Sequence, residues 1–332
     1  MQGKDMSDLP KCYRCRQEYR NGACGCKDNV TLYPGDGMEI MPAMPPDSVD
    51  LVFGSPPYED ARTYGIDFRL KEQEWVDWMV EIVQVSLRVS RGLVAFVVEG
   101  RTRQFRWSAT PALLMADLHR AGVHLRKPPA FHRVGIPGSG GPDWLRNDYE
   151  FIVCCTSGGK LPWSDNTAMG HPPRWDPGGA MSNRNADGCR VNGRAGPRAT
   201  ARRKRKADGT REVQGYSVPG KANPANIIQQ TYTAGEVVAI LQHAGDVTHH
   251  NVGGGQMGDP LAHENEAPFP ESLAEFFVRS FCPPGGVVLD PFSGSGTTVA
   301  VARKHGRQGI GIDLRESQME IAANRLRQKV LF

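Results

Sequence analysis

A glycine-rich turn near the end of the chain restricts the fold more than any other part of the sequence. Residues 287–290 form a short apolar run that predicts a buried strand, and a helical pattern begins near Thr297. Between them, Gly294 and Gly296 let the backbone adopt positive φ and come close to a ligand. The free N–H groups at the start of the helix can bind a carboxylate. This order predicts a ligand site at the carboxyl end of a strand in an α/β sheet.

The remainder of the sequence alternates between strand and helix patterns, as an α/β sheet requires. Residues 49–53 and 93–98 are apolar runs, typical of strands that are buried on both faces of a parallel sheet. Residues 69–90 have helical periodicity and contain neither Gly nor Pro. Further strands are expected at residues 31–33, 149–155 and 309–313, and further helices at residues 113–119, 271–281, 297–305 and 317–330.

Size and composition are those of an ordinary globular protein with one long irregular region. The 332 residues are enough for a sizeable α/β domain and an accessory module, and 39% of them are hydrophobic. Residues 158–235 are rich in Gly, Pro, Asn, Arg and Ser, which is typical of a loop-rich or disordered insert. No run reaches the roughly 20 apolar residues of a membrane span, so we expect a cytoplasmic protein without membrane contact.

Two common nucleotide cofactors do not fit the glycine turn. A phosphate-binding P-loop needs a Lys before its Ser or Thr, but Gly296 is followed by Thr297 and Thr298. A dinucleotide-binding turn needs a third glycine, which this turn lacks. The acidic residue that opens the turn, Asp290, can instead pair with an ammonium group. Neither nucleotide cofactor has such a group, so the turn favours a different cofactor.

A second motif, Ser55-Pro56-Pro57-Tyr58, follows the strand expected just before it. Its chemistry suits an aromatic amine, whose nitrogen is a poor nucleophile because its lone pair is delocalised into the ring. Two acceptors on the amine N–H groups would localise that pair, and the Ser55 hydroxyl and the Pro56 carbonyl can supply them in a turn that Pro57 stiffens. Tyr58 offers a flat face on which an extruded base can stack, a contact worth about 1–3 kcal/mol. The alternative is an ordinary Pro-Pro turn after a strand.

The two motifs together, residues 55–58 before residues 290–298, resemble the signatures of the S-adenosylmethionine-dependent DNA amino-methyltransferases. The order is that of the permuted members, in which the catalytic half comes first, and the resemblance covers roughly residues 31–158 and 249–330. It implies a Rossmann-like methyltransferase fold with a mostly parallel seven-stranded sheet, one antiparallel strand and a circularly permuted motif order. It also implies S-adenosylmethionine as the cofactor and double-stranded DNA as the partner.

The target implied by the resemblance is the exocyclic amino group of a flipped base. Serine at position 55 and the sequence Arg62-Thr-Tyr-Gly65 resemble the branch that methylates cytosine N4. Adenine N6 is the alternative, because Ser-Pro-Pro-Tyr does not strictly exclude it. Residues 147–151 resemble a wall of the base pocket, where Asp148 and Tyr149 either contact the base or cap a strand. The predicted catalytic residues are Ser55, Pro56, Pro57 and Tyr58.

The predicted cofactor contacts come from the turn and from the resemblance. Asp290 would pair with the ammonium of the methionine moiety, and Asp313, at the end of the next strand, would accept hydrogen bonds from ribose hydroxyls. Asp36 resembles the acid that accepts from the adenine amino group, and Phe269 lies in a segment that resembles the packing beside the methionine end. Simpler roles stay open, with Asp313 as a helix cap and Asp36 as a turn residue. The predicted cofactor-binding residues are Asp36, Phe269, Asp290, Pro291, Phe292, Gly294, Gly296, Thr297 and Asp313.

Positive charge is concentrated in one stretch, although the net charge of the chain is only +4. Residues 190–211 contain nine Lys or Arg and a single acid, Asp208. The stretch lies between the two halves, where the resembled family has its target-recognition region. Basic side chains there would bind phosphates and make the affinity depend on salt, unless the stretch is a solvated charge run. The predicted DNA contacts are Arg202, Arg203, Lys204, Arg205 and Lys206.

Four of the eight cysteines, Cys12, Cys15, Cys24 and Cys26, lie close together near the start of the chain. Four thiolates can close a tetrahedral zinc site, and the metal would supply the folding energy that so short a stretch lacks. The Cys-x-Cys spacing of the second pair departs from the usual Cys-x2-Cys, and reduced thiols in a flexible tail are the alternative. We predict a structural Zn²⁺ here, which is not part of the resemblance.

These patterns divide the chain into four predicted parts and give one predicted activity. The parts are a cysteine-rich zinc knuckle (residues 1–29), a catalytic half (30–158), a partly disordered target-recognition insert (159–248) and a cofactor-binding half (249–332). The activity is that of a site-specific DNA methyltransferase that favours cytosine N4. A restriction endonuclease is the expected partner in a restriction-linked role, while a solitary or phage-borne role and the oligomeric state stay open. A methyltransferase for RNA or a protein amide and an inactive DNA-binding relative are the remaining alternatives.

Overall fold

The computed structural model describes residues 9–16, 26, 29–60, 68–132, 143, 145, 147–171, 203–205, 211–213, 221, 223–224, 226–229 and 269–327. The chain forms two compact units, one made of residues 1–165 and 225–332 and the other of residues 166–224. Among the described residues, every helix is too short or too polar to span a lipid bilayer.

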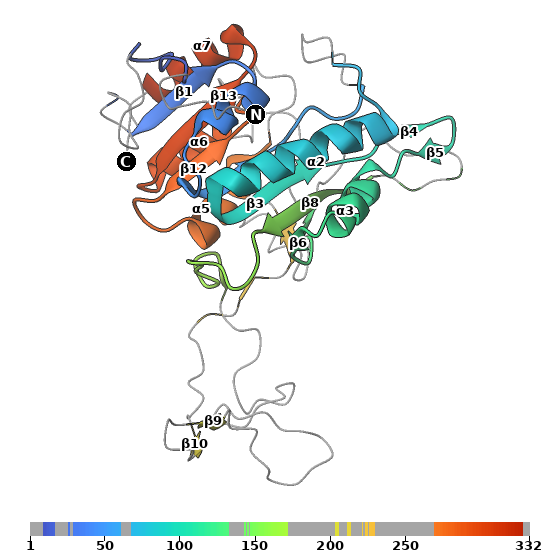
Figure 1. Cartoon of the computed structure of the whole chain (residues 1–332), viewed down its shortest axis with the longest axis vertical. Coiled ribbons are helices and arrows are strands. Elements are labelled where there is room, and N and C mark those ends of the chain that lie inside the picture. The colour runs from blue at the N-terminus through green and yellow to red at the C-terminus, as the bar shows by residue number, and fades with distance from the viewer. Residues whose placement is uncertain are drawn as a thin grey trace, which may run out of the picture. The chain divides into compact units, whose positions relative to one another are not determined.

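A nine-stranded sheet forms the centre of the larger unit (Figure 1). Its order is β1 (Val30–Pro34), β13 (Gln308–Asp313), β12 (Val287–Asp290), β2 (Val49–Gly54), β3 (Ser90–Val98), β8 (Tyr149–Thr156), β7 (Ala130–His132) and β11 (Ile227–Gln229), with β6 (His124–Leu125) paired to β8. The strands from β1 to β3 pair in parallel, whereas β8 runs antiparallel to β3, β6 and β7. The predicted fold, a mostly parallel α/β sheet with one antiparallel strand, is therefore confirmed. The sheet has nine strands rather than seven because the short strands β6 and β11 add to it.

The sequence does not predict β6, β7 and β11, because runs of two or three residues are too short to show a periodicity. Each of them acquires its geometry from a neighbouring strand. Phe131 of β7 pairs with Glu150 of β8, and Ile228 of β11 pairs with Phe131 in turn. β11 lies inside the stretch predicted as the recognition insert, yet it joins the main sheet.

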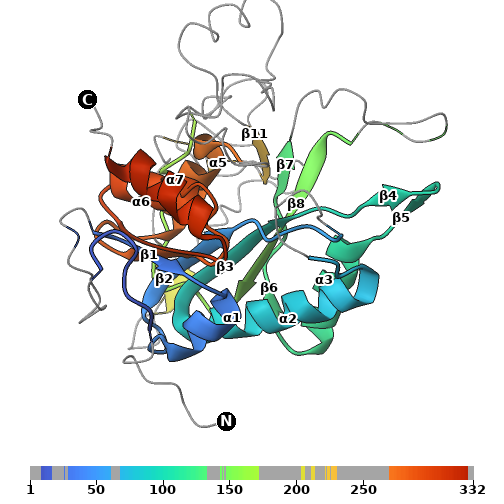
Figure 2. The same cartoon turned by 90° about the horizontal axis from the view of Figure 1, so that it is seen from above.

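Helices cover both faces of the sheet (Figure 2). One face carries α1 (Gly37–Ile40), the 3-10 helix η2 (Met41–Ala43), α2 (Glu72–Val89) and α3 (Thr110–Arg120), and the other carries α5 (Glu271–Phe281), α6 (Thr297–Lys304) and α7 (Glu316–Arg327). The buried strand β2 contributes to both layers. Val52 packs into the core under α2, whereas Leu51 and Phe53 pack into the core under α5. This two-sided burial is what the apolar run in the sequence predicts.

Tertiary contacts set the ends of several predicted elements. α2 begins at Glu72 rather than at residue 69, because Glu59 Oε2 accepts a hydrogen bond from the Glu72 N–H (3.0 Å) and so replaces a cap that Lys71 does not supply. β3 begins at Ser90, because Ser90 pairs with Val49 of β2. Past the end of β3, a short antiparallel hairpin joins β4 (Thr102–Arg103) to β5 (Arg106–Trp107), and the sequence patterns do not predict it.

The smaller unit contains one described antiparallel pair, β9 (Arg203–Arg205) with β10 (Arg211–Val213). The backbone of three predicted DNA contacts therefore lies in a β-strand. Arg202 and Lys206 lie outside the described residues, as do Cys24 and residues 62–65 and 263–268. The division of the chain at residues 29, 158 and 248 stays a prediction.

Candidate active site

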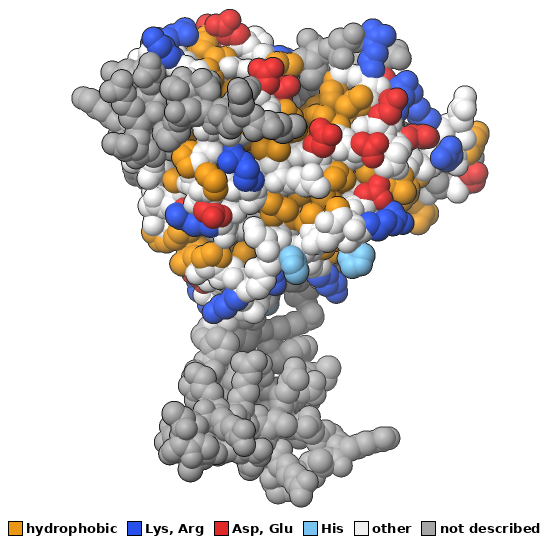
Figure 3. All heavy atoms as spheres, in the orientation of Figure 1, with side chains coloured by type: hydrophobic (Ala, Val, Ile, Leu, Met, Phe, Trp, Pro, Cys, Tyr) orange, Lys and Arg blue, Asp and Glu red, His pale blue; other side chains and the backbone are white. Residues whose placement is uncertain are grey.

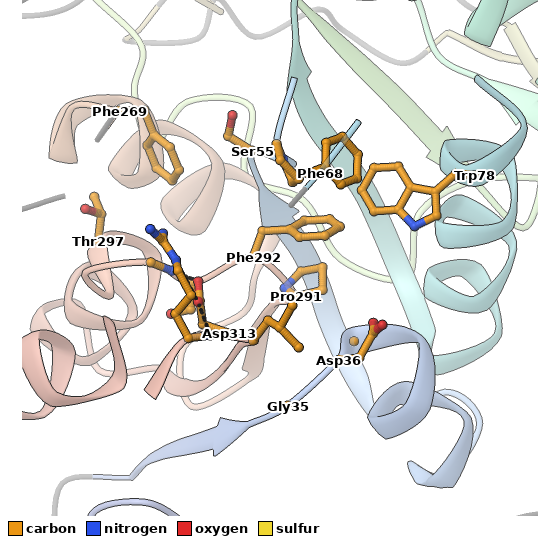
Figure 4. Close-up of a pocket in the computed structure, with 16 residues that line it drawn as sticks. Gly35, Asp36, Ser55, Phe68, Trp78, Phe269, Pro291, Phe292, Thr297 and Asp313 are labelled. Atoms are coloured by element: carbon orange, nitrogen blue, oxygen red, sulfur yellow. Dashed lines mark hydrogen bonds and ion pairs between the residues drawn. The ribbon is translucent and has the colours of Figure 1, made fainter. Parts of the chain in front are cut away.

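A cavity of about 190 Å³ opens where neighbouring parallel strands end (Figure 4). β1, β13, β12 and β2 are adjacent in the sheet, so the segments that follow them meet at one edge. Both predicted motifs contribute to the wall of this cavity, although they come from opposite ends of the chain. The lining residues are Gly35, Asp36, Gly37, Ser55, Pro57, Phe68, Trp78, Phe269, Pro291, Phe292, Ser293, Gly294, Thr297, Asp313, Leu314 and Arg315.

The glycine turn has the backbone that its sequence predicts. Gly294 and Gly296 have φ of +49° and +79°, values that residues with a side chain rarely adopt. Gly296 also packs closely against α7, since a Cβ at this position would lie 2.9 Å from the Cβ of Ala322. α6 begins directly after it, and Thr297, in the first turn of that helix, lines the cavity.

Asp290 is buried at the end of β12, with 1% of the residue exposed, and it does not line the cavity. Its Oδ1 accepts a hydrogen bond from the Phe292 N–H (3.0 Å), and Oδ2 has no hydrogen-bond partner among the described residues. Burial raises the pKa of Asp290 from 3.8 to about 7. β2 approaches so closely because residue 54 is glycine, where a Cβ would lie 2.3 Å from Oδ1. The expected pairing of Asp290 with an ammonium group stays a prediction.

Asp313 and Asp36 line the cavity from the ends of β13 and β1. Asp313 Oδ2 accepts from the Gly294 N–H (2.8 Å) and Oδ1 accepts from the Arg315 N–H (2.9 Å), so this carboxylate ties the glycine turn to the start of α7. Burial raises the pKa of Asp313. Asp36 caps α1 by accepting from the Met38 N–H (2.8 Å). The simple structural roles are therefore present in both residues, and both still line the cavity.

The Ser55 turn is held between β3 and α2. The Ser55 hydroxyl donates to the Val97 carbonyl (3.3 Å), and the Trp75 indole N–H donates to the Pro57 carbonyl (2.9 Å). Ser55 and Pro57 line the cavity, whereas Pro56 is buried and Tyr58 is half-buried outside the lining. The turn is thus a fixed part of the cavity wall.

Most of the predicted cofactor-binding residues share this cavity with Ser55 (Figure 4). Phe269 reaches it by packing edge-on against Phe53 of β2, with ring centroids 5.5 Å apart. The structure does not bring every predicted residue to the surface of the cavity. Four of them do not line it: Asp290, Gly296, Pro56 and Tyr58.

Sequence reasoning missed several lining residues, above all two aromatic ones. The helical pattern assigns Trp78 to the apolar face of a helix, yet its ring lies 5.7 Å from that of Phe292 and 5.0 Å from that of Phe68. A tryptophan at helical spacing carries no signal that separates the two roles. Leu314 and Arg315 could have been found, because residues directly after a parallel strand line the crevice at its end.

Another carboxylate with a raised pKa, Glu99, lies directly after β3. Glu99 Oε1 accepts from the Gly100 N–H (2.9 Å) and from the Trp107 indole N–H (3.3 Å), while Oε2 is buried without a hydrogen-bond partner among the described residues. Burial raises the pKa of Glu99 to about 7, and the nearby Glu150 adds to this rise. Glu99 does not line the cavity.

The family model of the N6/N4 DNA methylases matches residues 49–324, a span that contains both motifs and most of the cavity wall. The chain belongs to this family. The family predicted from the two motifs is therefore confirmed.

Solved structures support the fold of this DNA methylase. The PvuII DNA methyltransferase, named as cytosine-N4-specific, superposes with a TM-score of 0.59 over 92% of this chain and 88% of its own, at 18% identity. A putative DNA modification methylase from Thermus thermophilus gives a TM-score of 0.51 over 90% of this chain and 95% of its own, at 20% identity. At these identities the likeness shows the fold alone.

Curated relatives match the methylase in two ways. The type II methyltransferase M.SfiI of Streptomyces fimbriatus is 23% identical over 95% of both chains, and the DNA adenine methyltransferase YhdJ of Escherichia coli is 23% identical over 89% of this chain and 82% of its own. Other matches are local. The type II methyltransferase M.ScaI of Streptomyces caespitosus is 48% identical over 60 residues, which are 18% of this chain. The chain matches between 18% and 28% of the length of M.ScaI and four further relatives.

The cysteine cluster of this methylase lies beside the edge strand β1. The Sγ atoms of Cys12, Cys15 and Cys26 lie within 4.8 Å of one another, and those of Cys12 and Cys26 are 3.9 Å apart. A disulfide would hold two sulfurs at about 2.05 Å, whereas two thiolates on one zinc, with Zn–S bonds of about 2.3 Å, are about 3.8 Å apart. The segment is tied to the sheet, since the Tyr13 N–H donates to the Leu32 carbonyl of β1 (2.7 Å).

Proposed function

We propose that this methylase transfers the methyl group of S-adenosylmethionine to the exocyclic amino group of a flipped base in double-stranded DNA, with cytosine N4 as the target. The observation that carries the proposal is the shared cavity. Ser55, from the predicted amine clamp, faces the same space as Gly294, Thr297 and Asp313 from the predicted cofactor turn. A methyl donor and a methyl acceptor need such a common space to come within reacting distance.

The lining residues suit the parts of S-adenosylmethionine. The N-terminus of α6 and the bare backbone of the glycine turn can receive its carboxylate. Asp36 and Asp313 can accept from amino and hydroxyl groups, and the rings of Phe292 and Trp78 offer apolar faces for the adenine. When bound, the cofactor supplies an electrophilic methyl group on a sulfonium, whose sulfur takes up the bonding electron pair on transfer.

The contribution of the protein is to orient the amine. The Ser55 hydroxyl uses its proton on the Val97 carbonyl, which leaves its oxygen lone pairs available to an N–H of the base. An acceptor on that N–H localises the nitrogen lone pair, which then forms the new N–C bond, and the methylated nitrogen releases its proton to water. No strong base is required before the attack, so positioning and fixed dipoles would supply most of the rate.

The choice of cytosine N4 rests on serine at position 55 and on Arg62-Thr-Tyr-Gly65, which lies outside the described residues. Relatives of both kinds occur, since PvuII DNA methyltransferase is cytosine-N4-specific and YhdJ is an adenine methyltransferase. Adenine N6 is therefore the second candidate target.

Two further features complete the proposal. The basic residues Arg202, Arg203, Lys204, Arg205 and Lys206 would contact DNA phosphates, and a restriction endonuclease would be the partner in a restriction-linked role. Cys12, Cys15 and Cys26, together with Cys24, would hold a structural Zn²⁺ whose sulfur spacing the described thiols already approach.

Mass spectrometry of nucleosides tests this function directly. The purified protein is incubated with S-adenosylmethionine and duplex DNA of mixed sequence, and the digested DNA is analysed. We expect N4-methylcytosine, and S55A should reduce its formation at least about 100-fold while calorimetry shows unchanged cofactor affinity. Formation of N6-methyladenine instead would change the proposed target from cytosine N4 to adenine N6. Methylated RNA or protein with unmodified DNA would refute the function, and loss of cofactor binding in S55A would refute the assigned role of Ser55.

A further inference from the structure

The β4–β5 hairpin has an unusual turn. Arg103 pairs with Arg106, and the two residues between them, Gln104 and Phe105, have φ of +47° and +63°. Positive φ at both central residues is the geometry of a type I′ turn, where Asn-Gly is favoured because most side chains raise the energy of this backbone. This chain has a glutamine and a phenylalanine there.

The phenylalanine at this turn is also exposed to solvent. Phe105 is 70% exposed, and Trp107 at the end of the hairpin is 39% exposed. Figure 1 shows the hairpin projecting past the start of α2, and Figure 3 shows hydrophobic, basic and acidic side chains next to one another at this end of the unit. The side chain of Arg106 is 75% exposed and lies 3.6 Å from the exposed Glu72 carboxylate, and the side chain of Arg103 is 49% exposed. A strained backbone that presents an exposed apolar ring indicates a binding function.

Buried acids tie the base of the hairpin to the predicted amine clamp. Glu59 and Asp60 directly follow Tyr58, and they are only 5% and 2% exposed. Glu59 Oε1 accepts from the Arg101 N–H (3.0 Å), and the Asp60 carbonyl accepts from Arg101 Nη1 (2.9 Å). The Asp60 carboxylate forms an ion pair with Arg103. Ion pairs and hydrogen bonds of a buried carboxylate are rigid, so the hairpin keeps a fixed position relative to the clamp.

A continuous row of rings leads from the hairpin to the start of β8. Trp107 stacks on Phe151 with ring centroids 6.1 Å apart, and Phe151 meets Tyr149 edge-on at 5.3 Å. Tyr149 is itself exposed. Exposed aromatic faces of this kind are suited to stacking on nucleic acid bases.

We propose that Phe105 is a wedge that enters the base stack of duplex DNA beside the target and holds the target base out of the helix. The proposal rests on the function proposed above. Extrusion disrupts stacking and pairing, and an apolar side chain inserted at the gap replaces part of the lost stacking. Arg106 contacts a neighbouring phosphate in place of its exposed partner Glu72, whereas Arg103 stays paired with Asp60. The tie through Glu59 and Asp60 sets the distance between the wedge and the clamp that receives the base.

The test compares methylation of two duplexes by the wild-type protein and by F105A. The methylated site is first located by sequencing DNA that the protein has modified, and short duplexes are made with the target either normally paired or opposite an abasic site. F105A should methylate the paired duplex at least about tenfold more slowly, which corresponds to the loss of one stacking contact. On the abasic duplex its rate should stay within about twofold of wild type, because that base is extruded at little cost. F105W should restore the rate on the paired duplex.

A fluorescence measurement gives a second readout that a merely structural role would not change. Pyrrolocytosine, a fluorescent cytosine analogue that still pairs with guanine, at the target position should brighten when wild-type protein binds and should stay quenched with F105A. L113A, which removes an exposed apolar side chain of α3, is the matched control and should behave as wild type. Equal rates of F105A and wild type on the paired duplex, or an equal loss on both duplexes, would overturn the wedge. If the wild-type protein itself methylates no DNA, the proposed function fails and the wedge fails with it.

Discussion

The carboxylate of Asp290 lies at a buried position that disfavours its charged form. It is buried at the foot of the glycine turn, it uses one oxygen to hold the Phe292 N–H, and its pKa is raised to about 7. The sequence predicts that Asp290 faces an ammonium group. The structure shows a different immediate contact, with the backbone of its own turn. Such a carboxylate should make the stability of the protein without cofactor depend on pH.

The prediction concerns D290N. Between pH 3.8 and about 7 the folded state binds more protons at this site than the unfolded state, so the free energy of unfolding falls as pH rises through this window and is level above it. The fall from this group is at most about 4 kcal/mol. D290N keeps an oxygen that can accept from the Phe292 N–H and removes the titrating carboxyl group. The free energy of unfolding of D290N should therefore change less with pH than that of wild type. Urea unfolding between pH 4 and pH 8 measures this.

E99Q is the matched variant for that comparison, because burial also raises the pKa of Glu99 to about 7, but Glu99 lies directly after β3 and away from the glycine turn. It should flatten the curve independently of D290N, and the two effects should add. A D290N curve with the same slope as wild type would show that Asp290 is ionised in the folded protein throughout this range.

Among the helices and strands, the sequence predicts those that have an apolar or periodic pattern of their own. It does not predict short strands that form only by pairing with a neighbouring strand. The helix at α2 and the strands β2 and β3 have long apolar patterns, and the structure contains them within a few residues of the predicted ends. β7 and β11 have no pattern of their own and exist because a neighbouring strand offers hydrogen bonds. The residues of the candidate site divide in the same way. Residues at the ends of long strands could be predicted, whereas Trp78 and Phe68 enter the cavity only through tertiary packing.

The segment that contains Cys12, Cys15 and Cys26 has no periodic pattern, and its predicted zinc site can be tested separately. Cys12 is fully buried, and its neighbour Tyr13 bonds to β1, the edge strand that leads to Asp36 at the cavity. Metal analysis should find about one zinc per chain. C12S should abolish that zinc, lower the melting temperature by about 5 °C or more and weaken cofactor binding through the Asp36 loop.

C154A provides the control, since Cys154 is a buried thiol of β8 outside the cluster. It should lower stability through lost packing while the zinc content stays at the wild-type level. A wild-type protein that is fully folded and free of metal would contradict the zinc site.

At the scale of the larger unit, the decisive feature is the meeting of two distant parts of the chain in one sheet. β12 lies between β13 and β2, and the Val287 N–H donates to Asp50 Oδ2 (2.9 Å) across 237 residues of sequence. The parallel pairing of Val288 with Leu51 brings the carboxyl ends of both strands to the same edge. The order of the two motifs along the chain therefore does not affect the site, because the sheet brings both motifs to the same edge.

A crystal structure of the protein with S-adenosylmethionine bound tests this account most directly. The quantity to measure is the distance from the transferable methyl carbon to the hydroxyl oxygen of Ser55. An amine that is hydrogen-bonded to Ser55 and in line with the methyl group requires this distance to be within about 6 Å. We expect the cofactor in the cavity between Asp36, Asp313 and Phe269, with its methyl group directed toward Ser55. A cofactor bound elsewhere, or one in this cavity with its methyl group facing away from Ser55, would contradict the claim that the two motifs form one active site.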